Sequence, residues 1–398
     1  MNVLLEQYRE EMKQELEDIL AYWMKFTIDT KNGGFIGRID HDNNIDAVAP
    51  KGSVLNSRIL WTFSAAYHLT KREEYLKLAE RAFQYLADYF IDKEFGGVYW
   101  TVNHKGEPLD TKKQIYALSF AVYGLSEFYQ ATKNEKALGF ADHIYGDIVR
   151  YSYDEKNGGY IEALTRDWKE INDLRLSAKD ANEKKSMNTH LHVLEAFVNF
   201  YRVSPGEPLR AQLQELIRLF ADRIISKETN HLVLFFDDEW NQRSNLVSYG
   251  HDIEASWLIQ EAVEIIEDRS VKIKDRLLAL VKAAGEGLDQ DGGLWYEHDP
   301  VENQLIKQKH SWPQAEAMIG FFNAWQNTGD EKYLRQSLKS WEFVKKHMHD
   351  KNCGEWYWGV NEDYSPMRKE DKVGIWKCPY HNSRACIEII NRINSLID

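Results

Sequence analysis

Three histidines are placed where they could carry out acid–base chemistry. His192, His251 and His381 each lie near the start of a mostly apolar segment, in MNTHLHVLEAFVNFY, SYGHDIEASWLIQEA and WKCPYHNSRACIEII. Imidazole has an ordinary pKa close to neutrality, so it can both remove and return a proton at physiological pH. A single buried histidine is usually a hydrogen-bonded core residue, but three in corresponding segments indicate a shared site.

The spacing of polar residues separates side chains that face a site from side chains that pack. In the segment with two histidines, polar residues fall at i, i+4, i+7 and i+11, which on a helix form one stripe: Asn188, His192, Glu195 and Asn199. His190 instead shares its helix face with apolar residues. We therefore choose His192 over His190 as the candidate functional residue.

Carboxylates lie close to the other two histidines. His251 and Glu254 are three residues apart, so we expect the Glu254 carboxylate to accept a hydrogen bond from one imidazole nitrogen. That bond would fix the tautomer and raise the basicity of the ring. The last segment repeats this arrangement with His381, Arg384 and Glu388.

The remaining three segments carry an arginine, a tyrosine and a tryptophan at a similar distance after the repeated phrase. Arg58 lies in VLNSRILWTFSAAYHL and Tyr116 in KQIYALSFAVYGL. Trp312 precedes Pro313, a residue suited to the first turn of a helix, and Glu316 follows one turn later. Arg58 could also form a structural ion pair, and Trp312 alone could be a core residue. If the segments converge, these residues form one pocket.

A repeat organises the whole chain. A phrase consisting of an acidic turn, glycine and then aromatic residues occurs five times, at 29–40, 92–103, 154–164, 289–299 and 350–361. Its first glycines are 63, 62, 134 and 62 residues apart, and the third interval equals two units. The missing copy falls in HLVLFFDDEW, residues 231–240, which lacks the glycines. The chain therefore consists of six units.

Helical periodicity fills the sequence between these phrases. Residues 75–91 are amphipathic, and residues 115–132 are apolar on nearly all sides. We predict an all-α fold, an (α/α)6 barrel of six hairpins with short β excursions in the hairpin loops, as a single catalytic domain over residues 1–398. An open helical solenoid is the alternative, because it also repeats helix pairs.

The composition limits the partners. With 50 Lys and Arg against 63 Asp and Glu, the formal net charge is −13, which argues against nucleic acid or an anionic membrane as the main partner. No apolar run approaches the roughly 18 residues that a membrane span requires. The beginning is charged from Glu6 onward, unlike a secretory signal. We expect a cytoplasmic protein and leave its oligomeric state open, a monomer included.

The three cysteines fit the same compartment. Cys353, Cys378 and Cys386 are an odd number without a CxxC pair, as expected in a reducing cytoplasm, and they predict neither a disulfide framework nor a zinc cluster. Cys378 lies close to His381, but nothing in the sequence nearby indicates an activated thiolate. We therefore expect Cys378 to be a packing residue.

Three chemistries suit such a pocket. Three histidines could bind zinc, although no HExxH or similar close spacing is present. Paired carboxylates could hydrolyse glycosides, and four are available: Asp237, Asp238, Glu254 and Glu316. Two histidines could instead move a proton at a carbon next to a carbonyl, with an arginine stabilising the enediolate. We favour the third chemistry, with a sugar as substrate, because sugar rings stack on aromatic side chains.

Five blocks of the sequence resemble a known family. RILW (58–61), KSMNTHLHVLEAF (185–197), SYGHDIEASWL (248–258), PQAEAMIGFFNA (313–324) and WKCPYHNSRACIEII (376–390) are similar to the signature blocks of cellobiose 2-epimerases, a subgroup of the N-acylglucosamine 2-epimerase superfamily. The resemblance runs in order from about Gly33 to Arg392. The fold of that superfamily is the α/α six-hairpin barrel.

The resemblance implies an isomerase that needs no metal, nucleotide or other cofactor. Its reaction would be epimerisation at C2 of the reducing-end glucose of β-1,4-linked disaccharides of the cellobiose, lactose or mannobiose type, by ring opening and a cis-enediolate. His251 and His381 match the two acid/base histidines of the family. His192 and Arg58 match the residues that assist ring opening and hold the enediolate, and Glu254 matches the partner of His251.

The resemblance also concerns the substrate contacts. Trp312 and Trp376 match aromatic positions near the sugar, and Tyr116 is a looser match; Asn188 and Glu316 complete the predicted substrate-binding set. Many relatives have a second tryptophan where this chain has Ser311. This difference leaves open a monosaccharide substrate, as in an N-acylglucosamine 2-epimerase or a mannose or aldose–ketose isomerase.

Overall fold

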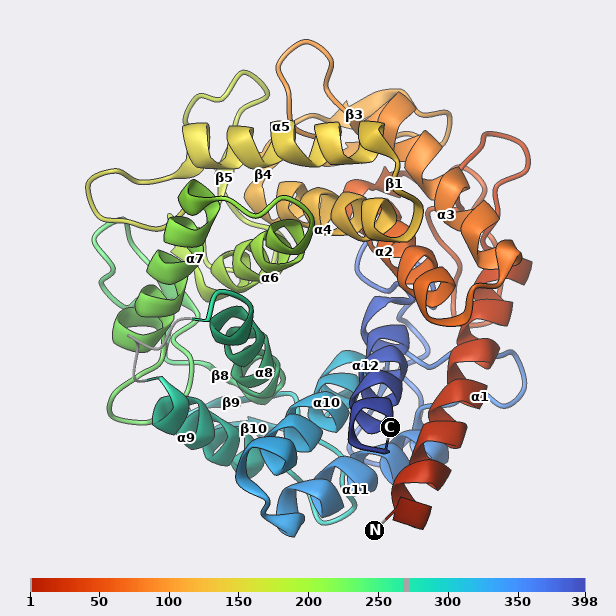
Figure 1. Cartoon of the computed structure of the whole chain (residues 1–398), viewed down its shortest axis with the longest axis vertical. Helices are drawn as coiled ribbons and strands as arrows, with labels where there is room; N and C mark the ends of the chain where they lie inside the picture. The colour runs from red at the N-terminus through yellow and green to blue at the C-terminus, as the bar shows by residue number, and fades with distance from the viewer. Residues whose placement is uncertain (1, 268–272, 398) are drawn as a thin grey trace.

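Helices in two concentric rings make up the computed structural model, which describes residues 2–267 and 273–397 (Figure 1). The inner helices are α2 (Ser53–Thr70), α4 (Ile115–Thr132), α6 (Met187–Val203), α8 (Tyr249–Ile265), α10 (Ser311–Thr328) and α12 (Tyr380–Ile397). The outer helices are α1 (Asn2–Phe26), α3 (Glu73–Tyr85), α5 (Glu135–Ser152), α7 (Glu207–Leu219), α9 (Lys274–Ala284) and α11 (Glu331–His347).

The two ends of the chain close the ring. Consecutive inner helices pack against each other around the circle, and α12 packs against α2. The first helix, α1, pairs with the last, α12, so that both termini lie on the same side of the ring (Figure 1). An open solenoid would leave its first and last helices apart. The predicted (α/α)6 barrel is therefore confirmed, and the solenoid alternative is wrong.

Burial explains why each helix lies where it does. In α4 every residue from Ile115 to Phe128 is buried, which agrees with its apolar sequence and its predicted bounds. The outer helix α3 buries one face, including Tyr75, Ala79 and Ala82, and ends in a π-helical turn over Leu86–Phe90. Within the described ranges, no helix is long and apolar enough to cross a membrane.

The glycine phrases form tight loops between an outer helix and the next inner helix. Gly33 and Gly34 have φ angles of 81° and 61°, and a Cβ on Gly34 would lie 2.5 Å from the Tyr85 ring. Only glycine fits such a position without strain. In the fourth loop, which lacks the glycines, Asn230 adopts the left-handed conformation instead (φ 62°). The copy of the repeat that lacks the glycines therefore lies in the fourth loop, where the sequence predicted it.

Very short strands connect neighbouring loops at one end of the barrel. Each strand that leads into an inner helix pairs antiparallel with a strand in the following loop: β1 (Lys51–Gly52) with β2 (Thr101–Val102), β4 (Lys113–Gln114) with β5 (Ala163–Leu164), β6 (Lys185–Ser186) with β7 (Phe235–Phe236), β8 (Val247–Ser248) with β9 (Glu297–Asp299), and β11 (Lys309–His310) with β12 (Gly359–Val360). Strands β3 (Pro108–Asp110) and β10 (Gln304–Ile306) extend two of these pairs. A bridge between Ile39 and Val373 joins the first loop to the last.

A buried lysine ties most of these strands to the loop before them. The Nζ atom of Lys113 lies 2.8 Å from Asp92 Oδ2 and donates to the Gly96 carbonyl at 2.7 Å. The same ion pair recurs between the lysine and the loop aspartate at Lys51, Lys185, Lys309 and Lys372. In the fourth hairpin Val247 replaces the lysine, and His231 bonds to Asp252 instead. These contacts fix where each inner helix begins.

We predict that Lys113→Met lowers the free energy of unfolding by about 2 kcal/mol, because the buried Asp92 carboxylate loses its lysine and keeps the half-buried Arg166 as a charged partner. Both side chains of this pair are fully buried. Urea denaturation followed by circular dichroism measures the effect. The control is Lys93→Met, at an exposed position of the same loop, which should change stability by less than about 0.5 kcal/mol. Equal midpoints for the two variants would contradict the anchoring role.

Candidate active site

The predicted site residues gather in the first two turns of the inner helices. Each inner helix follows a long loop that comes from an outer helix, so all six run in the same direction and begin at the same end of the barrel. Four of the predicted residues are the sixth residue of their own helix: Arg58, His192, Glu254 and Glu316. Four others are the second residue of their helix: Tyr116, Asn188, Trp312 and His381. His251 is the third residue of α8. The three histidines therefore occupy different positions in their helices, contrary to the expectation that the positions would be equivalent.

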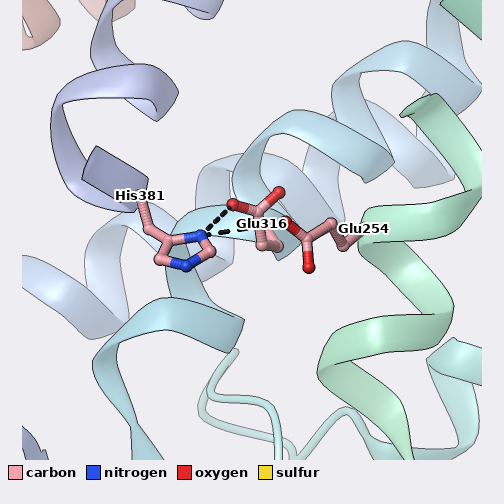
Figure 2. Close-up of side chains that lie close together, drawn as sticks. All are labelled: Glu254, Glu316 and His381. Carbon is pink, nitrogen blue, oxygen red and sulfur yellow. Dashed lines mark hydrogen bonds and ion pairs between the residues drawn. The ribbon is translucent and has the colours of Figure 1, made fainter. Parts of the chain in front are cut away.

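His381 is held by a carboxylate from the neighbouring helix α10. Its Nδ1 lies 2.7 Å from Glu316 Oε1 and 3.9 Å from Glu254 Oε1 (Figure 2). The other oxygen of Glu316 accepts a hydrogen bond from Trp257 Nε1 at 3.0 Å. With Nδ1 bound to a carboxylate, Nε2 is the nitrogen left to exchange a proton with a ligand. The His381 side chain is 15% exposed, whereas Glu316 is fully buried.

The partner predicted for His251 is wrong. Its Nδ1 is hydrogen-bonded to Ser248 Oγ at 2.8 Å, and Glu254 instead accepts from Arg384 Nη2 at 2.7 Å. Helical side chains lean toward the N-terminus, so His251 reaches the residue before its helix. The longer Glu254 extends to α12. The predicted partnership of His381 with Glu388 is also wrong, because Glu388 bonds to Arg392, one turn along the same helix, at 3.1 Å.

Arg384 connects three buried carboxylates from three different helices. Its Nη2 donates to Glu254 Oε1 at 2.7 Å and to Glu316 Oε1 at 2.6 Å. Its Nη1 donates to Glu195 Oε1 and to the hydroxyl of Tyr380, which itself donates to Glu195. The sequence placed Arg384 beside His381 but gave no sign of these partners, since they lie on α6, α8 and α10.

His192 is also held by a carboxylate. Its Nδ1 lies 2.7 Å from Glu195 Oε2, and its ring packs against Phe120 with a centroid distance of 4.8 Å. The polar stripe is therefore confirmed at its centre, while Asn199 turns away to donate to the Tyr123 carbonyl. His190 accepts a hydrogen bond from the Tyr160 amide at 2.9 Å, the structural role expected for it.

Arg58 lies in an aromatic environment rather than in an ion pair. Its Nη2 donates to Tyr116 Oη at 2.8 Å, Nη1 contacts Cys378 Sγ at 3.7 Å, and the guanidinium carbon lies 4.1 Å from the Phe120 ring centroid. Among the described residues, no carboxylate oxygen lies within 4.0 Å of it. A structural ion pair is therefore wrong for Arg58, and its charge remains available to a ligand.

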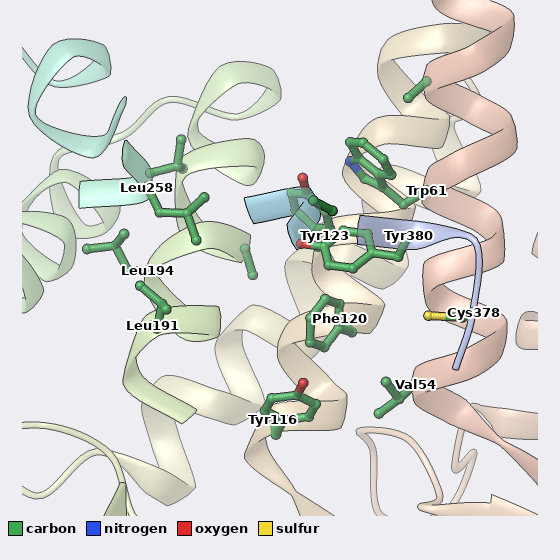
Figure 3. Packing of buried hydrophobic residues seen from close by; sticks show 14 of the residues in the cluster. Val54, Trp61, Tyr116, Phe120, Tyr123, Leu191, Leu194, Leu258, Cys378 and Tyr380 are labelled. Carbon is green, nitrogen blue, oxygen red and sulfur yellow. The ribbon is translucent and has the colours of Figure 1, made fainter. Parts of the chain in front are cut away.

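Aromatic rings surround the histidines. The Trp312 ring lies 4.7 Å from His251 and 5.6 Å from His381, measured between centroids. Trp376 lies 6.0 Å from Tyr116 in the same way. Figure 3 shows Tyr116 in a column of packed aromatic rings along α4, a column that continues with Phe120 and Tyr123 toward Trp61 and Tyr380.

Asn188 occupies a different part of the same end of the barrel. It lines a cavity together with Glu162, Leu174 and Ser186. Its buried Oδ1 has no hydrogen-bond partner among the described residues. The structure therefore brings Arg58, His192, Glu254, Glu316 and His381 into one network or its immediate surroundings, but it gives Asn188 no contact with that network.

Burial keeps the histidines neutral. It lowers the pKa of His251 to about 3, and the positive charge that His192 can take up adds to this effect. It also lowers the pKa of His381 well below its usual range, and the charges of Arg58 and Arg384 act in the same direction. Both rings therefore have lone pairs to accept a proton at neutral pH.

The carboxylates divide into two kinds. Burial raises the pKa of Glu254 well above its ordinary value, and the negative charge of Glu316 adds to this effect. The pKa of Glu316 is also raised, chiefly by burial. Burial opposes ionisation of Glu195 too, but Arg384 and His192 outweigh it and lower its pKa to about 2. Its charged neighbours thus favour the ionised form of Glu195, whereas burial favours a proton on the pair Glu254 and Glu316.

The geometry bears on the zinc and hydrolase alternatives. The potential ligand atoms of Glu254, Glu316 and His381 lie within 4.8 Å of one another, but Arg384 donates to both carboxylates and takes the place of a cation between them. The two carboxylates also lie closer together than the separation of about 5 Å or more that is typical of glycoside hydrolases. Asp237 is bound by Asn241 within its own turn.

Comparisons with known proteins show which family the chain belongs to. The model of the N-acylglucosamine 2-epimerase (GlcNAc 2-epimerase) family matches residues 33–385. A cellobiose 2-epimerase of Bacteroides fragilis is 50% identical over 385 residues, which cover 96% of this chain and 98% of that protein. The structure of cellobiose 2-epimerase from Bacillus thermoamylovorans B4167 superposes with a TM-score of 0.94 at 39% identity, covering 97% of this chain and 100% of that one.

A more distant likeness shows the fold alone. A D-mannose isomerase structure superposes with a TM-score of 0.84 at 22% identity, covering 96% of this chain and 98% of that one. The family match and the close relatives are decisive: the chain belongs to the N-acylglucosamine 2-epimerase family. The expectation of an isomerase that works as an epimerase is confirmed.

We predict that the ring signals of His251 and His381 do not titrate between pH 7.5 and 5.5. Their lowered pKa values keep both rings neutral over that range, whereas an imidazole with an ordinary pKa of about 6.5 would change there. NMR of protein labelled at histidine Cε1 measures this, with assignments from His251→Asn and His381→Asn. A midpoint near 6.5 for either ring would show that its pKa is not lowered.

Proposed function

We propose that this chain epimerises C2 of the reducing-end sugar of a β-1,4-linked disaccharide such as cellobiose. The observation that carries the proposal is the arrangement of His251 and His381, two neutral histidines that both contact the Trp312 ring. Each has one nitrogen fixed by a protein partner and the other left for a ligand. The names of the close relatives support a disaccharide as substrate.

Ring opening comes first, because only the open form has the aldehyde that acidifies the C2 proton. His192, oriented by Glu195, is placed to move the proton between the anomeric hydroxyl and the ring oxygen. The Arg58 guanidinium, which packs against the same Phe120 ring as His192, would then stabilise the oxygen that becomes negative. Its lack of a carboxylate partner supports this role.

One histidine then removes the C2 proton, and the bonding electrons pass into the C1–C2 double bond of a cis-enediolate. The second histidine returns a proton to C2 from the opposite face, which inverts the configuration and restores the aldehyde. For this step the histidine that acts as the acid must carry a proton to donate, and the histidine that acts as the base must have a free lone pair. When His381 is the acid, its Nε2 carries the proton that goes to C2, and its Nδ1 accepts the proton that burial favours on the pair Glu254 and Glu316, so these three groups supply the acid together. In the reverse reaction the two histidines exchange roles.

A second candidate is an epimerase or aldose–ketose isomerase that acts on a monosaccharide. Ser311 favours it, because a serine beside Trp312 gives a second sugar ring no aromatic surface to stack on. The same catalytic residues would serve, and delivery of the proton to C1 instead of C2 would give the ketose. A glycoside hydrolase is less consistent with the closeness of Glu254 and Glu316.

The test is an NMR time course of the EDTA-treated protein with cellobiose in D₂O. We expect a mannose-type reducing end to appear with deuterium at C2 and no free glucose. Unlabelled product or added water in the product mass would contradict C2 proton exchange. If cellobiose does not react, N-acetylglucosamine or mannose in the same tube tests the second candidate.

We also propose four properties that rest on the composition, the repeat and the family resemblance rather than on the site. They are a cytoplasmic location, action without metal or other cofactor, a small sugar as the partner and organisation as one domain over residues 1–398. EDTA in the assay bears directly on the metal. The oligomeric state stays open.

A further inference from the structure

A single guanidinium lies between the carboxylates that orient two of the site histidines. Arg384 bonds to Glu195, which holds His192, and to Glu316, which holds His381. We propose that Arg384 is a positioning residue that makes the His192 and His381 groups one unit, so that ring opening and C2 proton transfer both depend on it. This inference rests on the proposed function.

Burial separates Arg384 from direct contact with substrate. Its side chain is only 1% exposed, compared with 15% for His381. Its two terminal nitrogens are already bound to Glu195, Glu254, Glu316 and Tyr380. It therefore acts through these carboxylates, and its planar, bidentate geometry fixes their positions relative to each other.

The charge balance makes the dependence strong. Three buried carboxylates surround one positive charge, and buried charges without partners are costly. Without Arg384, Glu316 would hold a proton up to higher pH and would no longer offer a charged acceptor to His381 Nδ1. Glu195 would lose its main stabilising charge in the same way, and with it the ability to stabilise a protonated His192.

The test compares Arg384→Lys with three supporting variants. Lysine keeps the charge but loses the fork of hydrogen bonds. Arg384→Met combined with Glu254→Gln removes one carboxyl group together with the guanidinium, which limits the folding defect, and Glu254→Gln alone is its reference because Glu254 belongs to the group that supplies the acid. The matched control is Arg392→Met on the same helix, which removes bonds to Glu388, Asn323 and Gln326 outside the site.

We expect Arg384→Lys to lower kcat for cellobiose by about 100-fold with little change in KM, because the orienting contacts act on the chemical steps. In the double variant, the acidic limb of kcat/KM should also move to higher pH, since Glu316 is harder to ionise. Arg392→Met should retain kcat within about threefold and keep the same pH profile.

A merely structural role would give a different result. If Arg384→Lys and the double variant keep the wild-type kcat and pH profile, or lose activity only in proportion to the unfolded fraction seen by circular dichroism, the inference is wrong. Failure of the proposed function is recognised separately, because the wild-type protein would then be inactive on cellobiose. In that case the same variants are compared on the sugar that the wild type does convert.

Discussion

The buried contact between Arg384 and three glutamates is the interaction on which the rest of the site depends. It joins α12 to α6, α8 and α10, and the side chains involved are almost completely buried, so that losing one partner is costly. The same contact orients Glu195 and Glu316, and through them His192 and His381. The same contact therefore holds the inner helices together and orients the histidines of the site.

The loops supply the second constraint. Five of the described inner helices follow a short strand, and in three of them the fourth residue holds the preceding loop: His190, Asp252 and Gln314 accept the amides of Tyr160, Leu232 and Leu294. Because the fourth residue points to the loop, residues two and six of the same turns point elsewhere, toward the barrel axis. This repeated geometry explains why one end of the barrel collects the histidines, the arginine and the glutamates.

The sequence could predict what is local or repeated. The six units, the place of the fourth loop, the bounds of α4 and the choice of His192 over His190 all depend on spacing along the chain. Contacts between helices could not be read in this way. Glu254 was assigned to His251 because the two are a turn apart, but the long glutamate reaches Arg384 across the ring, whereas the shorter histidine finds Ser248. The roles of the site residues in catalysis stay predictions.

The central claim is that two histidines act on opposite faces of C2, and hydrogen exchange tests it most directly. In D₂O, His251→Asn and His381→Asn are each given both C2 epimers of the disaccharide, and loss of the C2 proton is followed by NMR. The account predicts that each variant exchanges this proton in only one epimer, a different one for each variant, without interconverting them. Exchange of the same epimer by both variants, or epimerisation by either, would contradict it.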